Sequence, residues 1–446
     1  MKTSLLGKFL VSGAVLFVLM AGAPPAARCQ ITAETVKNWR EAAARGDASA
    51  QNNLGVMYDR GYGVAEDDAE AVRWYRKAAE HGIPDAQYNL GVAYQNGEGV
   101  EADDATAARW YRKAAEQGYA RSQFNLGLLY ANAKGVAEDD AEAVRWYHEA
   151  AVQGLADAQS NLGLMYANGD GVAEDDAEAV RWYRQAAEQG FASAQFNLGL
   201  MVANGEGVAE DDAEAVQWYR RAAEQGLADA QCNLGLLIAN GEGVAKDDAE
   251  AVRWYRKAAS QGLAEAQFNL GLMYANGKGV AEDDPQAVEW YRKAAKQEFA
   301  TAQFNLGLMF ANGEGVAEDD AEAMKWYRKA AEQGLSEAQY NLGVAYRDGE
   351  RVAEDDAEAV KWYRKAAQQG NALAQNNLGF MYANGDGVAQ DFVLAHRWWN
   401  LARAQGHEKA ERGLAALNPL MTKEQIAEAQ RLTRGEQRAV SAPPPD

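Results

Sequence analysis

Adjacent aspartates are the most frequent residues in this sequence that could do chemistry. Nine Asp-Asp pairs recur along the chain, from Asp67-Asp68 to Asp355-Asp356. Paired carboxylates can act in acid–base catalysis or hold a divalent cation. Each pair, however, precedes a helical pattern, where aspartate is a favoured N-cap, and the spacing of a calcium-binding loop is not met. We therefore predict that the pairs cap helices, with the second aspartate as the cap, as at Asp176. A weak cation-binding edge is the alternative.

The other reactive residue types do not combine into a recognisable site. The four histidines follow no common spacing, and no Ser-His-Asp or Cys-His set can be assembled. The Gly-x-Gly-Val segments follow helical patterns rather than strands and lack the third glycine of a dinucleotide-binding loop, so they are predicted turns. We predict no catalytic residues, no metal site and no cofactor.

These residues belong to a sequence repeat of 36 residues. Asn-Leu-Gly recurs ten times at this interval, with its leucine running from Leu54 to Leu378, and an aromatic pair beginning with Trp follows 20 residues after each leucine. Residues 47–406 are therefore predicted to be ten repeats without an insertion. Cys29 and Cys232 are about six repeats apart, too far to form a disulfide in an extended array. Cys232 stands where other repeats have Phe or Tyr, which predicts a passive thiol.

Each repeat is predicted to fold as helix, loop and helix. In residues 155–190 the first helix carries an apolar stripe through Leu162 and Met165 and ends at Asn168-Gly169. The second helix presents Trp182 and Tyr183 on one side, and a glycine ends it. Neither helix can bury its apolar face alone, so the repeats must stack. The predicted fold is an all-α solenoid with capping helices.

The two ends of the chain have different predicted roles. Residues 1–29 read as a signal peptide cut between residues 23 and 29, because a positive start precedes a 12-residue apolar run and small residues follow it. The run is shorter than the ~20 residues that span a bilayer. A retained anchor is the alternative. Residues 32–46 are a predicted capping half-repeat and residues 407–435 predicted capping helices, with a capping box at Thr422 and Gln425. Residues 436–446 are a predicted disordered tail. The mature chain is thus expected to lack a membrane span and to be exported, to the periplasm or the exterior of a bacterium.

The repeat pattern, Ala-x-Ala-Gln-Phe-Asn-Leu-Gly-Leu-Met-Tyr-Ala-Asn-Gly followed by Trp-Tyr-x-x-Ala-Ala, resembles the Sel1-like repeat family, which is related to tetratricopeptide repeats. The resemblance covers residues 47–406. It implies a right-handed α/α superhelix and a role as an adaptor between proteins. One branch of that family has a cysteine pair in each repeat, and some of its members are associated with β-lactam binding; this sequence lacks those pairs. Ala133 and Arg351 replace loop glycines, where we expect backbone strain, and Glu298 replaces the glycine after a second helix.

The resemblance also implies that the first helix of each repeat lines a concave groove. Two positions on this helix are candidates for binding a partner. One is a mostly aromatic row, which could anchor a partner segment or could instead pack between adjacent helices. The other is an invariant asparagine, which could bond a peptide backbone, although its invariance favours a bond that ties the helix to its neighbour. The predicted binding residues are Tyr88, Phe124, Phe196, Phe268, Phe304, Tyr340, Asn89, Asn125, Asn197 and Asn269.

The charge balance narrows the choice of partner. The chain has 44 Lys and Arg against 65 Asp and Glu, a net charge of −21. This disfavours nucleic acid and anionic lipid as partners. We therefore predict an extracytoplasmic scaffold, not an enzyme, that presents a long concave surface to a protein or peptide. The alternatives are an envelope hydrolase or β-lactam-binding protein, and a secreted virulence or host-interaction factor.

Overall fold

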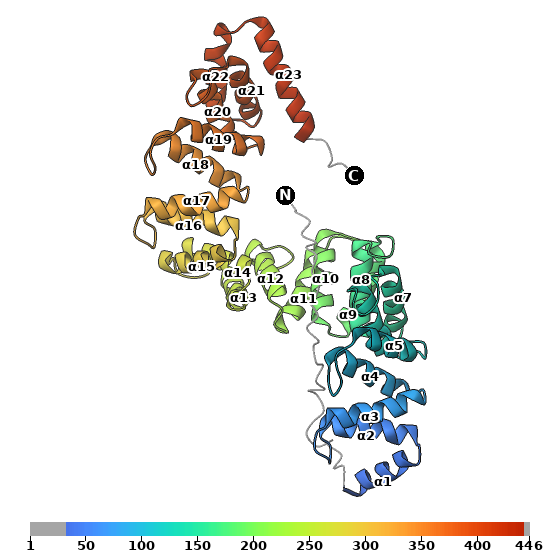
Figure 1. Ribbon diagram of the computed structural model, residues 1–446. Helices are drawn as coiled ribbons and strands as arrows, with labels where there is room; N and C mark the ends of the chain where they lie inside the picture. The colour runs from blue at the N-terminus through green and yellow to red at the C-terminus, as the bar shows by residue number, and fades with distance from the viewer. Residues whose placement is uncertain (1–32, 441–446) are drawn as a thin grey trace. The chain divides into compact units, whose positions relative to one another are not determined.

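In the computed structural model, which describes residues 33–440 and their side chains through residue 434, all regular secondary structure is helical (Figure 1). Helix α1 (Ala33–Ala44) comes first and ten helix pairs follow, which confirms the predicted all-α repeat solenoid. The first helices of the pairs are α2 (Ala48–Arg60), α4 (Pro84–Asn96), α6 (Ala120–Ala131), α8 (Ala156–Asn168), α10 (Ala192–Asn204), α12 (Ala228–Asn240), α14 (Ala264–Ala275), α16 (Ala300–Asn312), α18 (Ser336–Asp348) and α20 (Ala372–Asn384).

In most pairs, the second helices pack against the first helices of their own pairs and against those of the next pair along the chain. They are α3 (Asp68–Glu80), α5 (Asp104–Ala115), α7 (Asp140–Ala151), α9 (Asp176–Glu188), α11 (Asp212–Glu224), α13 (Asp248–Ser260), α15 (Asp284–Lys296), α17 (Asp320–Glu332), α19 (Asp356–Gln368) and α21 (Phe392–Ala404). The chain divides into two compact units, Met1–Ala186 and Ala187–Asp446.

The aspartate pairs begin the second helices, but the capping residue is the first of each pair. Asp175 Oδ1 accepts a hydrogen bond of 3.0 Å from the backbone N–H of Glu178, whereas Asp176 is already the first residue of α9. The prediction that Asp176 is the cap was therefore wrong by one position. The tenth repeat contained the signal, because it retains the first aspartate, Asp391, and has Phe392 in place of the second; Asp391 caps α21.

A leucine, a glycine and a tyrosine pack together between the two helices of a repeat. Leu90 of α4 and Tyr111 of α5 are both fully buried. The Tyr111 ring lies directly on Gly91, where a Cβ atom would come within 2.6 Å of the ring. The glycine of the Asn-Leu-Gly motif therefore makes room for the tyrosine of the Trp-Tyr motif. This packing explains why both motifs recur with the same period.

The loops between paired helices also contact the preceding repeat. Gly99, in the loop between α4 and α5, has a φ of +65°, and a Cβ atom there would lie 2.2 Å from the carbonyl oxygen of Asp68 in α3. The second loop glycine thus fits against the first turn of the previous second helix. In the ninth repeat Arg351 takes this position, and its Nε lies 3.0 Å from Asp320 Oδ1 at the start of α17.

Backbone strain occurs at two of the three positions where glycine is replaced. Ala133 has a φ of 54° and Glu298 a φ of 63°, so both adopt the left-handed conformation that favours glycine. Arg351 does not, so the strain predicted there is absent. Its loop adopts another conformation, and Arg351 also donates a hydrogen bond of 3.0 Å to the carbonyl of Ala311.

After the tenth repeat come α22 (Glu408–Leu417), a short 3-10 helix (Asn418–Leu420) and α23 (Lys423–Val440). The predicted capping box starts α23, since the Gln425 side chain accepts from the Thr422 backbone N–H at 2.9 Å and the Thr422 hydroxyl accepts from that of Gln425 at 3.2 Å. Helix α23 extends into the segment predicted as a tail, whose last six residues lie outside the described part. The predicted signal peptide lies outside it as well. None of the helices in residues 33–440 combines the length and apolar character that crossing a bilayer requires.

Candidate protein-binding face

Every first helix has one side turned away from the core, which we call the outer face. In α12 the core side carries Ala230 and Leu234, both fully buried. The outer face carries Asp229, Asn233 and Leu236, at spacings of four and three residues. Such spacings place side chains in line on one side of a helix. The predicted aromatic and asparagine positions lie on or beside this face in each repeat.

The predicted aromatic residues are half-buried, so they are neither sealed in the core nor fully available. Each ring contacts the tyrosine of the second helix in its own repeat. The ring centroids are 5.8 Å apart for Phe124 with Tyr147, and the other five pairs are equivalent: Tyr88 with Tyr111, Phe196 with Tyr219, Phe268 with Tyr291, Phe304 with Tyr327 and Tyr340 with Tyr363. One side of each ring therefore packs between helices, and part of each ring meets solvent.

The asparagines reach back to the preceding repeat. The Asn125 side chain is hydrogen-bonded to the hydroxyl of Tyr111. Burial raises the pKa of this tyrosine, and the hydrogen bond acts in the opposite direction. Asn269 Nδ2 lies 3.8 Å from Cys232 Sγ on the previous first helix. Asn89 and Asn197 are half-buried at the equivalent positions. These contacts support the structural interpretation of the asparagine row, in which it ties one first helix to its neighbour.

Cys232 takes the aromatic position in α12 and is 1% exposed. Burial raises the pKa of its thiol, so the thiol stays protonated at neutral pH. The residue behaves as a small apolar side chain at this position.

A row of apolar side chains on the outer face, exposed in three repeats and half-buried in the other seven, was missed by the sequence analysis. Leu236 and Leu272 are each 40% exposed, and Phe380 is 41% exposed. Their position lies two residues after the invariant leucine, outside the buried stripe, and is apolar in every repeat. That signal was available in the sequence. The full row is Val56, Val92, Leu128, Leu164, Leu200, Leu236, Leu272, Leu308, Val344 and Phe380.

A second missed feature is a relay of glutamine side chains. Gln123 of α6 is 3% exposed and donates to the carbonyl of Ala115 in the preceding repeat at 3.1 Å. Its Oε1 accepts a hydrogen bond of 2.7 Å from Gln153, which follows α7. In the first repeat the donor position holds His81, and Gln51 Oε1 has no hydrogen-bond partner among the described residues. The relay is structural, because its glutamines on the first helices lie in the core.

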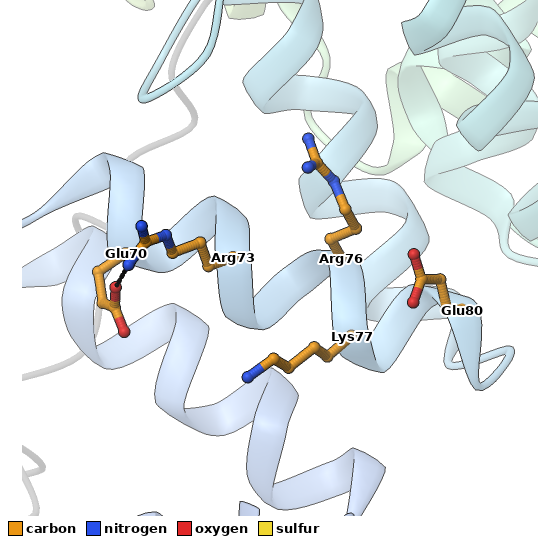
Figure 2. Close-up of a pocket in the computed structure, with 5 residues that line it drawn as sticks. All are labelled: Glu70, Arg73, Arg76, Lys77 and Glu80. Atoms are coloured by element: carbon orange, nitrogen blue, oxygen red, sulfur yellow. Dashed lines mark hydrogen bonds and ion pairs between the residues drawn. The ribbon is translucent and has the colours of Figure 1, made fainter.

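The second helices present a different surface, rich in charge. Several of their tryptophans donate a hydrogen bond from Nε1 to a glutamate one turn earlier, as Trp146 does to Glu142 at 3.1 Å. On α3 a shallow hollow of ≈ 370 Å³ is lined by Glu70, Arg73, Arg76, Lys77 and Glu80. Figure 2 shows these side chains spread along the helix surface rather than converging on one point. Among the side chains of residues 33–434, no group of three or more His, Cys, Asp or Glu is arranged to hold a metal ion.

The Sel1 repeat model matches this chain ten times in succession, from residues 48–83 to residues 372–407, with one match for each helix pair. The chain belongs to the Sel1 repeat family. The first match begins one residue later than the repeat boundary drawn from the sequence. Sel1 repeat proteins generally serve as scaffolds for protein interactions and are typically not enzymes.

Two solved structures of Sel1 repeat proteins are similar along much of the chain. One is c5321, described as a protective antigen of uropathogenic Escherichia coli with an SLR fold. It is 39% identical, the match covers 90% of this chain and 86% of that one, and the TM-score is 0.84. The other is a Sel1 repeat protein of Oxalobacter formigenes, 39% identical over 69% of this chain and 89% of that one, with a TM-score of 0.57. No curated protein matched.

Proposed function

We propose that this Sel1 repeat protein is an exported adaptor that binds a protein or peptide on the outer face of its first helices. The observation that carries the proposal is the apolar row of the outer face, exposed at Leu236, Leu272 and Phe380, which runs beside half-exposed aromatic rings. Leu236 and Leu272 are each 40% exposed, and the position is apolar in all ten repeats. Exposed apolar rows on an otherwise polar surface are typical of protein interaction sites.

Two further observations support the parts of this proposal. The apolar run at residues 9–20 has the length of a signal peptide, and the similar c5321 is described as a protective antigen, which fits a location outside the cytoplasm. The tetratricopeptide resemblance assigns the first helices to the concave side of the solenoid, where a partner would contact several repeats together. The findings do not favour the hydrolase or host-factor alternatives.

The test is a crosslinked pull-down of the mature protein from envelope extract. The variant Phe196→Ala/Phe268→Ala removes two rings of the outer face, and Gln217→Ala/Arg253→Ala is the matched control on exposed positions of α11 and α13. Circular dichroism confirms that both variants fold. We expect a stoichiometric protein partner that is lost from the ring variant and retained by the control. A partner retained by both variants would place the site elsewhere, and recovery of no partner would contradict the adaptor function.

A further inference from the structure

The charges on the outer face differ between the two compact units. In the first unit, Asp85, Arg121 and Asp157 take the same position on α4, α6 and α8, so the sign of charge alternates. Burial raises the pKa of Asp157, and the positive charge of Arg121 acts in the opposite direction. Asp157 thus has a basic residue of the same row near it.

In the second unit the corresponding row has no cation. Asp229 of α12 is followed by Glu265 of α14. Partial removal from water raises the pKa of Glu265, and the neighbouring charge that acts on it, Asp229, raises it further. No basic side chain among residues 187–434 forms an ion pair with either carboxylate. Two like charges therefore lie near each other on a protein surface without compensation.

The same two helices carry the exposed leucines. Leu236 follows Asp229 by seven residues and Leu272 follows Glu265 by seven, which is two helical turns, or about 10 Å along each helix. The 3.8 Å contact between Asn269 and Cys232 shows that α12 and α14 lie side by side. The outer faces of α12 and α14 thus form a surface with an acidic edge and a parallel apolar edge. We call this surface the acid–leucine face (Asp229, Glu265, Leu236 and Leu272).

We infer that the acid–leucine face binds a basic amphipathic helix of the partner protein, an inference that rests on the proposed function. Two helices whose side chains are in contact have axes about 10 Å apart, so Leu236 and Leu272 are separated by about the same distance. Residues i and i+7 of a bound helix are also about 10 Å apart. The apolar stripe of that helix covers Leu236 and Leu272, and its Lys or Arg side chains meet Asp229 and Glu265. Charge complementarity favours a basic segment, because an acidic one would face two uncompensated carboxylates.

The probe is a synthetic helical peptide of about 21 residues with leucine in an a/d heptad pattern and lysine elsewhere. Two matched peptides serve as controls. One has glutamate in place of lysine, and the other has the composition of the lysine peptide in scrambled order. Binding to the full mature chain is measured by fluorescence anisotropy near physiological salt. The scrambled peptide controls for general attraction to a chain of net charge −21. We expect the patterned lysine peptide to bind at least about tenfold more tightly than either matched peptide.

Three variants locate the binding. Asp229→Asn/Glu265→Gln removes the two charges, and Leu236→Ala/Leu272→Ala removes the exposed leucines; each is expected to weaken binding about tenfold. Glu224→Gln/Glu332→Gln makes the same change in net charge at exposed positions at the ends of α11 and α17, and is expected to leave binding unchanged.

Three results would overturn the inference: no binding of the lysine peptide, equal binding of the glutamate peptide, or equal loss in all three variants. Each is independent of the pull-down. A partner that is recovered from extract and lost from the Phe196/Phe268 variant would uphold the adaptor function even if the lysine peptide failed to bind.

Discussion

Replacing Gly99 by alanine tests whether the loops hold neighbouring repeats together. A Cβ atom at Gly99 would lie 2.2 Å from the carbonyl oxygen of Asp68, more than 1 Å inside ordinary van der Waals contact. Since that neighbour is helix backbone, the loop must move away. Gly82 is the matched control, because its φ of +86° is also left-handed but nothing lies within 4 Å of its Cβ position.

The magnitudes follow from these two geometries. A left-handed conformation costs alanine about 1–2 kcal/mol at both positions. Displacing the loop at residue 99 adds about 1–3 kcal/mol, as overpacking does in protein cores. Gly99→Ala should therefore lower the free energy of unfolding by about 2–5 kcal/mol, and Gly82→Ala by about 1–2 kcal/mol.

Hydrogen exchange measured by mass spectrometry is the suitable assay, because a repeat array need not unfold in one step. We expect faster exchange in α3, α4 and α5 for Gly99→Ala than for Gly82→Ala. If the two variants exchanged alike, the loop contact would contribute nothing to the packing of adjacent repeats, and the account of the second loop glycine would be refuted.

Three further predictions concern the cap, the relay and the acidic row. Asp211→Ala should lower the midpoint of thermal unfolding more than Asp212→Ala, because Asp211 Oδ1 accepts from the N–H of Glu214 and such a cap is worth about 1 kcal/mol; equal effects would contradict the assignment of the first aspartate as the cap. Gln267→Leu should cost about 2 kcal/mol in chemical denaturation, since Gln267 donates to Ala259 and accepts from Gln297, whereas Gln51→Leu, which loses one bond, should cost less. Glu265→Gln should stabilise the chain at neutral pH. The folded-state pKa of Glu265 is raised above 4.5, so its contribution to stability is present below that value and is lost as pH rises through the folded-state pKa. Thermal unfolding across pH 3 to 7 should show the advantage of the glutamine vanish at low pH, and an advantage that persisted there would show that the effect is not electrostatic.

The fold was predictable because its signal is periodic. Leu90, Gly91 and Tyr111 recur with constant spacing, with Trp399 in place of the tyrosine in the tenth repeat, and any arrangement that buries one such set buries all ten. The cap was misplaced by one residue because adjacent aspartates have the same intrinsic preference, and the tenth repeat, where only Asp391 remains, was not used to separate them.

The candidate site was harder to predict than the fold. Exposure depends on what neighbouring repeats cover, so the sequence did not show that Phe196 is half-buried against Tyr219 while Leu236 is more open. The leucine row was missed because an apolar position near a buried stripe is ordinarily assigned to the core. The Gln123 relay was missed because a side-chain amide does not reveal its partners until two repeats are placed together.

The glutamine relay has a consequence for how this protein can change over generations. Each junction between repeats uses the same bond, from a glutamine amide to a backbone carbonyl of the preceding repeat, as Gln231 donates to Ala223. A duplication or deletion of 36 residues by unequal recombination therefore joins two halves that already fit, and creates no junction that selection must first repair. The length of the outer face can thus change by one repeat at a time, and each change adds or removes one member of every row of side chains. A lineage can then match the array to a longer or shorter partner faster than point mutation could reshape a single pocket.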